Sequence, residues 1–121
     1  MVGISQALEW VYTGEIFDGH AAQEKGFVRS VHTPDELLKE AYKIARSIAE
    51  KSQVSITLAR QMMLRLSAAH HPRDAHNIDS LAIFYTSLND GKEGVASFLE
   101  KRTPEFKAKS STNMPDFYPW W

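Results

Sequence analysis

The sequence predicts a mainly α-helical fold of five or six helices with at most one short strand. Apolar residues recur every three or four positions along most of the chain, which is the spacing that places them on one face of a helix. Residues that typically begin or end helices separate these stretches. Residues 27–31 are the exception, because their aromatic and β-branched side chains favour a strand, for which the chain offers no evident partner.

The composition limits the possible classes of function. With 121 residues the chain is one domain's worth, and its net charge of −1 gives no reason to expect a nucleic acid or an anionic membrane as partner. The lack of cysteine excludes disulfides and thiolate metal sites and fits a reducing compartment. Residues 1–7 lack the basic and apolar pattern of a signal peptide, and no stretch approaches the ~20 apolar residues of a membrane span, so we expect a cytoplasmic protein.

Two helices are predicted near the beginning of the chain. Residues 2–13 carry apolar side chains at helical spacing, and Gly14 can close this helix in the left-handed conformation because it has no Cβ. Asp18 is suited to accept hydrogen bonds from the first free N–H groups of a second, short helix over residues 19–25. Gly26 should end that helix.

A third helix is predicted from Thr33 to about Lys51. Thr33 can cap it, Pro34 suits its first turn, and Glu36 would complete a capping box. Its apolar side chains lie on one face and its charged side chains on the other, so we expect the apolar face to be buried. The side chains expected in the core are Leu37, Leu38, Ile44 and Ile48.

Two further helices follow. The first covers residues 53–69, with Ser52 as its cap, and is apolar on two faces. A helix of this kind needs two packing partners, which predicts self-association. Pro72 should break it, because the residue before a proline avoids the helical conformation, and the next helix then covers residues 74–88.

The last predicted helix begins with Asp90 as its cap and with Glu93 completing a second capping box, which gives both carboxylates a structural role. Thr103 and Pro104 end this helix. We place residues 1–106 in one helical region and expect residues 107–121 to form an irregular tail. The aromatic side chains of the tail, either docked on a neighbour or exposed, include Phe117, Tyr118, Trp120 and Trp121.

Three histidines and an aspartate lie close together in the sequence, namely His70, His71, Asp74 and His76. Imidazole and carboxylate groups can bind zinc or copper. However, Pro72 interrupts the helix between them, so the spacing is not the i, i+4 pair that places two ligands on one face. The cluster is interpreted as a polar turn between helices, and no metal site is predicted.

His20 is a candidate for acid–base chemistry, because Asp18 and Glu24 lie near it in the sequence. A surface histidine on the short helix is the favoured interpretation. The chain has no glycine-rich phosphate loop and no nucleophile beside a base. No catalytic residue is therefore predicted.

Phe98 and Lys101 are the candidate binding residues. They lie one helical turn apart and so share a face, and an aromatic ring beside an ammonium can hold an adenine and a phosphate. In the alternative, Phe98 faces inward together with Val95 and Leu99, while Lys101 is solvated. The residues alone leave both interpretations open.

Two segments of the chain form a recognisable pattern. The first contains Thr13-Gly14, Phe17-Asp18, Ala21-Ala22, Gly26-Phe27-Val28 and Val31. The second runs from Asp90-Gly-Lys-Glu93-Gly94-Val95 to Phe98-Leu-Glu-Lys-Arg102. Each segment alone is a weak signal, but the two in this order, joined by helices of suitable length, are fairly specific. Together they resemble the C-terminal part of the crotonase family, the enoyl-CoA hydratases and isomerases.

This resemblance implies that the chain corresponds to the helical C-terminal region of an enzyme that acts on acyl-CoA thioesters. In the family, two backbone N–H groups form an oxyanion hole for the thioester enolate, and two glutamates handle water and protons in the hydratases. These groups belong to the family's N-terminal portion, so the chain alone would be inactive. Acyl-CoA would be the substrate of the whole enzyme, and no cofactor is implied.

The resemblance also implies partners. In the family this region covers the acyl-CoA site and packs the oligomer, so we expect self-association and a trimer or hexamer for the whole enzyme. Residues in the positions of Phe98 and Lys101 help to hold the CoA nucleotide, often that of a neighbouring subunit. The alternative is a standalone helical interaction module without enzymatic activity, because the two-faced helices and the aromatic tail also require partners.

Overall fold

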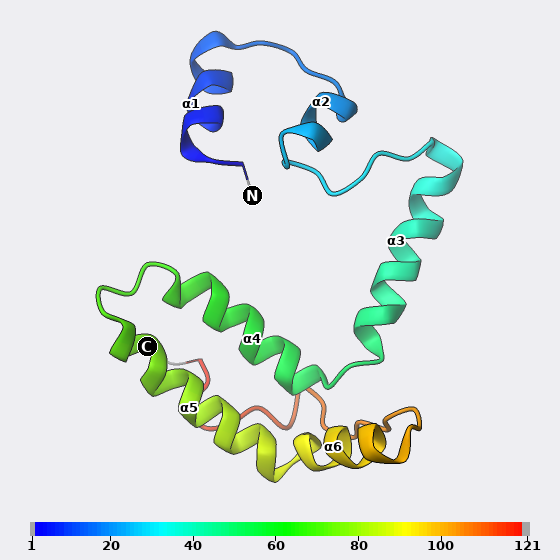
Figure 1. Cartoon of the computed structure of the whole chain (residues 1–121), viewed down its shortest axis with the longest axis vertical. Helices are drawn as coiled ribbons and strands as arrows, with labels where there is room; N and C mark the ends of the chain where they lie inside the picture. Colours follow the sequence, from blue (N-terminus) through cyan, green and yellow to red (C-terminus); the bar gives the residue numbers. More distant parts are fainter. Residues whose placement is uncertain (1, 120–121) are drawn as a thin grey trace. The chain divides into compact units, whose positions relative to one another are not determined.

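The computed structural model describes residues 2–119, and the predicted mainly helical fold class is confirmed. The six helices of the described residues are α1 (Ile4–Thr13), α2 (Gly19–Glu24), α3 (Pro34–Ala49), α4 (Gln53–Leu66), α5 (Pro72–Leu88) and α6 (Asp90–Glu100), as Figure 1 shows. The chain divides after Ile44 into two compact units. The predicted boundary after residue 106 stays a prediction.

An aromatic cluster holds the first unit together. The rings of Trp10 and Phe17 are stacked with their centroids 4.1 Å apart, and Phe27 meets them edge-on at 5.9 and 6.5 Å. The chain can fold back on itself here because Gly14 ends α1 with a positive φ of 62°. Asp18 then caps α2 by accepting a hydrogen bond of 2.8 Å from the Ala21 N–H, so both predicted signals are confirmed.

The strand predicted for residues 27–31 is wrong. Residues 27–29 form a bend, residues 30 and 31 have no regular secondary structure, and the described residues contain no β-strand. The N–H groups of Phe27 and Val28 both donate to the carbonyl oxygen of Ala22, at 2.8 and 3.3 Å, and so close the end of α2. A short strand is stable only beside another strand, and the Phe27 ring finds its contacts in the aromatic cluster instead.

The prediction that the apolar face of α3 is buried in a core is also wrong for this chain. Leu38 is 66% exposed, Leu37 and Ile48 are exposed as well, and Ile44 is only partly buried. The periodicity of α3 is that of an amphipathic helix, but the described part of the chain leaves its apolar face largely uncovered. An apolar face of this kind is available to another protein surface.

The core of the second unit lies between α4 and α5. These two helices lie side by side and run in opposite directions (Figure 1). Their buried side chains are Val54 and Leu58 from α4 and Ile78 and Ala82 from α5. A buried cluster of this size is modest, which makes every additional apolar contact on it significant for stability.

The C-terminal tail packs against this core. Phe117 lies edge-on to Tyr85 with the ring centroids 6.3 Å apart, and the Tyr85 hydroxyl donates to the carbonyl oxygen of Asn113 at 2.9 Å. Met114 and Tyr118 also pack on the buried cluster. The tail is irregular, and its described aromatic side chains are therefore docked rather than free. Trp120 and Trp121 lie outside the described residues.

The turn between α4 and α5 differs from the prediction in its bounds. Helix α4 ends at Leu66, and α5 begins at Pro72 rather than two residues later. Proline is well suited to a first turn, because the N–H it lacks would have no partner there. His71 caps the helix, since its Nδ1 accepts a hydrogen bond of 3.1 Å from the Arg73 N–H.

Candidate functional site

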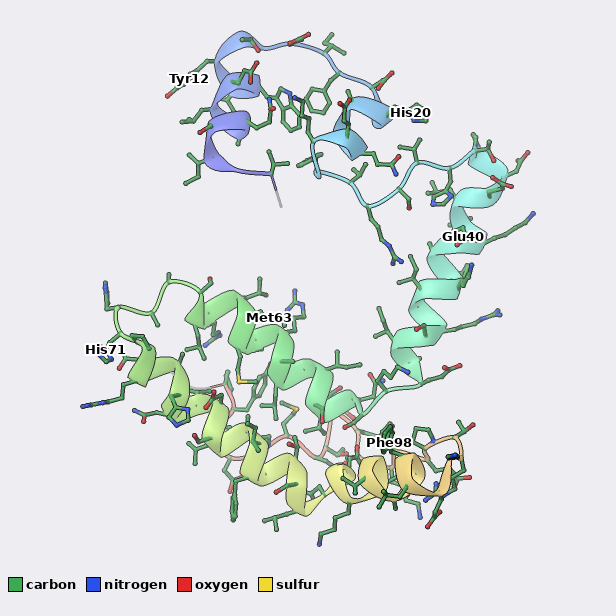
Figure 2. All side chains as sticks on the ribbon, in the orientation of Figure 1. Tyr12, His20, Glu40, Met63, His71 and Phe98 are labelled. Atoms are coloured by element: carbon green, nitrogen blue, oxygen red, sulfur yellow. The ribbon has the colours of Figure 1, made fainter. Side chains whose placement is uncertain are left out.

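The two candidate binding residues lie at the C-terminal end of α6. The Phe98 side chain, which is labelled in Figure 2, is 81% exposed, so its assignment to a core is wrong for this chain. Val95 and Leu99, which were also expected to face inward, are exposed too. The helix ends at Glu100, and Lys101 follows in the left-handed conformation with φ 53° and ψ 40°.

Two backbone hydrogen bonds close this helix end. The Lys101 N–H donates to the Phe98 carbonyl oxygen at 3.3 Å, and the Arg102 N–H donates to the Ser97 carbonyl oxygen at 3.0 Å. This pair of bonds is the Schellman arrangement, in which a left-handed residue reverses the chain direction after a helix. Lys101 therefore lies on the turn that ends α6, not on the helical face of Phe98.

Glu93 is the centre of a polar network beside this turn. Its two carboxylate oxygens accept hydrogen bonds from Nη1 and Nη2 of Arg102, at 2.5 and 2.9 Å. The Glu105 N–H donates to the same carboxylate at 2.7 Å, and the Arg102 Nε donates to Glu100 at 2.6 Å. The predicted capping-box role of Glu93 is therefore wrong, because charged and backbone donors after α6 occupy its oxygens.

These contacts determine the ionisation of the network. The hydrogen bond from Arg102, followed by that from the Glu105 N–H, lowers the pKa of Glu93 to about 2. The pKa of Arg102 is raised in turn, chiefly by its hydrogen bond to Glu93 and then by that to Glu100. Both groups are thus charged at neutral pH.

Asp90, the other predicted cap of this helix, makes contacts far along the chain. It is the first residue of α6, with Asn89 at the cap position. Its carboxylate accepts a hydrogen bond of 2.8 Å from the Ser52 hydroxyl and one of 3.4 Å from the Ala108 N–H. The capping assignment of Asp90 is wrong, because these donors from other segments take the oxygens that would have served the first turn.

An apolar groove lies between α5 and α6. It has a volume of about 610 Å³, and the apolar side chains of Ile83, Val95 and Leu99 line it beside Lys92. The two helices meet closely at Gly91, where a Cβ would lie 2.7 Å from the carbonyl oxygen of Thr86. Helical spacing alone could have grouped Val95 with Leu99, but not with Ile83 of another helix.

The histidines do not form a site with one another. His71 caps α5 (Figure 2), and the Nδ1 of His76 lies 3.0 Å from the Asp79 carboxylate in the next turn. Within residues 2–119, no three histidine, aspartate or glutamate side chains are grouped so that they could hold a metal ion. His20 is exposed on α2, and in this part of the chain it makes no hydrogen bond to Asp18 or Glu24.

A model of the family described as "Enoyl-CoA hydratase/isomerase" matches residues 1–109. The chain belongs to this family. The enoyl-CoA hydratase AKT3-2 of Alternaria alternata is 38% identical to it over 111 residues, which cover 88% of the chain and 36% of the relative. A probable enoyl-CoA hydratase of Rhizobium meliloti is 35% identical over 109 residues, covering 88% of the chain and 41% of the relative.

The fold is similar to that of solved hydratases. The crystal structure of an enoyl-CoA hydratase from Bacillus anthracis matches 88% of the chain with a TM-score of 0.79 and 28% sequence identity. The match covers 41% of that protein. The chain thus spans about two fifths of the length of the family members that it matches. None of the described helices is both long and apolar enough to cross a membrane.

Proposed function

We propose that this chain is the C-terminal helical part of an enzyme of the enoyl-CoA hydratase/isomerase family that acts on acyl-CoA thioesters. In this enzyme it covers the acyl-CoA site and contributes to the oligomer. The observation that carries the proposal is the end of α6, where an exposed aromatic ring and a lysine lie on adjoining turns. Family membership supplies the substrate class.

The chemistry itself belongs to the rest of the enzyme. The oxyanion hole that stabilises the enolate, and the glutamates that move water and protons, come from its N-terminal portion. This chain contributes no catalytic residue, and acyl-CoA is the substrate rather than a cofactor. We therefore expect the 121-residue chain alone to give no hydration of a short 2-enoyl-CoA above buffer, followed at the thioester absorbance. Turnover well above buffer would contradict this assignment.

Phe98 and Lys101 bind the nucleotide end of CoA. An aromatic ring that is free of other contacts can stack on an adenine, and an ammonium can make a charge-assisted hydrogen bond with a phosphate. The exposure of Phe98 supports this role, because a ring buried in a core would be unavailable. In the enzyme the nucleotide can be that of a neighbouring subunit.

The exposed apolar surface supports the oligomer. Leu37 and Leu38 on α3 and Met63 and Leu64 on α4 are all exposed. Apolar side chains grouped on helix faces in this way commonly mark contact surfaces. A trimer or hexamer of the whole enzyme would cover them. The cytoplasmic location stays a prediction, and one relative, from Dictyostelium discoideum, is named as mitochondrial.

Replacing Lys101 with alanine in the whole enzyme tests the binding role. Lys101→Ala should raise KM for the acyl-CoA several-fold with little change in kcat, since the lost contact is made equally in the ground state and the transition state. Lys39→Ala, the same change at an exposed position on α3, is the control. If Lys101→Ala leaves both KM and the inhibition by free CoA unchanged, Lys101 does not bind CoA.

The alternative is a standalone helical interaction module without enzymatic activity. The exposed faces of α3 and α4 favour it as much as they favour an oligomeric enzyme. The coding sequence upstream of this chain distinguishes the two. A reading frame that continues into a glycine-rich oxyanion segment supports the enzyme, and a stop codon there supports the module.

A further inference from the structure

Lys101 has a backbone conformation that lysine rarely adopts. Its φ of 53° lies in the left-handed region, where the Cβ of any residue other than glycine is crowded. Glycine is the usual residue at this position of a helix end, and Gly14 occupies the corresponding position after α1. A disfavoured conformation persists only where the surrounding structure imposes it, and such residues concentrate at functional sites.

Side-chain contacts between Glu93 and Arg102 reinforce this helix end, in addition to its two backbone hydrogen bonds. Arg102 directly follows Lys101, and its guanidinium is held by both oxygens of Glu93. Glu105, four residues after Lys101, donates its N–H to the same carboxylate. One carboxylate in the first turn of α6 therefore holds the chain after Lys101 at two points, Arg102 and Glu105. Lys101 thus lies between the helix and a segment that is anchored back onto that helix.

The same contacts direct both carboxylates of the network to Arg102 rather than to the Lys101 ammonium. The nearby carboxylates of Glu93 and Glu100 are both hydrogen-bonded to Arg102. Within the described part of the chain, the Lys101 side chain has no hydrogen bond or ion pair to a carboxylate. Glu93 is ionised at neutral pH, and Arg102 and the Glu105 N–H lower its pKa further, to about 2.

We propose that Glu93 and Arg102 are positioning residues that hold the Lys101 turn in its left-handed conformation, so that the Lys101 ammonium is presented to a phosphate of acyl-CoA. The inference rests on the proposed function, because it assigns a structural cause to the binding role of Lys101. Neither Glu93 nor Arg102 needs to touch the substrate for this role.

Two matched alanine substitutions in the whole enzyme separate positioning from simple electrostatics. Glu93→Ala and Glu100→Ala each remove one carboxylate that contacts Arg102, but only Glu93 also holds the Glu105 N–H. If charge alone mattered, removing either carboxylate near an anionic ligand would leave KM unchanged or lower it. We expect Glu93→Ala to raise KM several-fold with kcat almost unchanged, and Glu100→Ala not to raise it.

Two further variants extend the test. Arg102→Lys retains the charge but loses the planar fork that binds both oxygens of Glu93, so KM should also rise. In the double variant Glu93→Ala/Lys101→Ala, KM should be no higher than in Lys101→Ala, because a misplaced ammonium and a missing one cost the same binding energy. Fully additive effects would overturn the inference.

A structural measurement on the 121-residue chain is independent of activity. The NMR nuclear Overhauser effect between the amide and α protons of Lys101 reports the sign of its φ, because these two protons lie closer together at positive φ. We expect a left-handed value in the wild type and in Glu100→Ala, and a shift toward negative φ in Glu93→Ala. If Glu93→Ala unfolds the chain, the same measurement on Arg102→Lys tests the positioning role, and we expect the same shift toward negative φ.

The outcomes for the two proposals are distinguishable. If Lys101→Ala leaves KM unchanged, the proposed CoA contact fails and the inference fails with it. If Lys101→Ala raises KM but Glu93→Ala and Arg102→Lys do not, the CoA contact stands and the positioning role is wrong. If φ at Lys101 is unchanged in both positioning variants, the positioning role is also wrong.

Discussion

The guanidinium of Arg102 donates to both carboxylate oxygens of Glu93, at 2.5 and 2.9 Å, and joins the first turns of α6 to the segment that follows the helix. The two residues are nine positions apart, so the contact spans the length of α6 that carries Phe98. Planar two-point contacts of this kind fix orientation as well as distance. The geometry of the candidate site therefore depends on a carboxylate that lies outside it.

The Glu93 carboxylate makes stability depend on pH in the acidic range. Its pKa is lowered from 4.5 to about 2 in the folded chain, so it stabilises the fold fully above about pH 4.5, and this contribution is lost as the pH falls through about 2. We expect wild type to be more stable than Glu93→Gln at neutral pH, with the difference shrinking between pH 4.5 and 2. Urea unfolding at several pH values measures this difference in stability between the two proteins. A difference that stays constant with pH would contradict the prediction.

Gly91 should not tolerate a methyl group. A Cβ at this position would lie 2.7 Å from the carbonyl oxygen of Thr86, so Gly91→Ala must push α5 and α6 apart and should destabilise the fold by about 1–3 kcal/mol. Gly94→Ala is the control on the same helix, where the nearest atom would be a Phe106 ring carbon at 3.9 Å. That variant should gain about 0.5–1 kcal/mol from helix propensity.

The comparison of these two variants requires only urea denaturation of the purified chain. Because both are glycine-to-alanine changes within α6, their effects on the unfolded state are similar. Gly91→Ala with the stability of the wild type would show that the helices do not approach one another as closely as the structure indicates.

Leucines on α3 and α4 should respond differently to truncation. Leu58 is 1% exposed, so Leu58→Ala should cost about 2–5 kcal/mol of unfolding free energy. Leu38 is 66% exposed, so Leu38→Ala should change the unfolding free energy by no more than about 0.5 kcal/mol. The measurement is made at a dilution where the chain is monomeric, and a large loss in Leu38→Ala would instead place that residue in a core.

We expect the chain to self-associate at higher concentration. The exposed apolar side chains of α3 and α4 would be removed from water by contact with a second copy, which is favourable in free energy. Light scattering after size exclusion should give a mass above 13.7 kDa, the mass of one chain. Leu38→Asp should lower that mass, whereas Lys39→Asp should not, and a wild-type chain that stays monomeric at high concentration would rule out the association.

The features that the sequence alone determined are those whose partners lie within about one helical turn. Gly14 closes α1 with a bond to Trp10, Asp18 caps α2 through Ala21, and Ser52 caps α4 through Ser55. Each follows from local backbone geometry and the chemistry of one side chain. For the same reason the number of helices was predictable, although the bounds of α4 and α5 shifted by two or three residues.

Helical periodicity determined which side chains share a face, but not whether that face is covered. Leu38, Val95 and Leu99 lie at the spacing of buried residues, and all three are exposed. Burial depends on a second element that reaches the same face, and periodicity within one helix contains no information about it. Residues 27–31 are the corresponding case for a strand, since they have the right side chains but no neighbour to pair with.

Only the tertiary structure decided the role of the acidic residues of α6. Asp90 binds Ser52, 38 positions away, and Glu93 binds Arg102 and the N–H of Glu105 after the helix. A carboxylate pairs with the strongest donors within reach, and the folded chain determines which donors those are. The left-handed conformation of Lys101 could not be predicted from the sequence for the same reason. Lysine by itself disfavours this conformation, and the contacts that favour it form only in the folded chain.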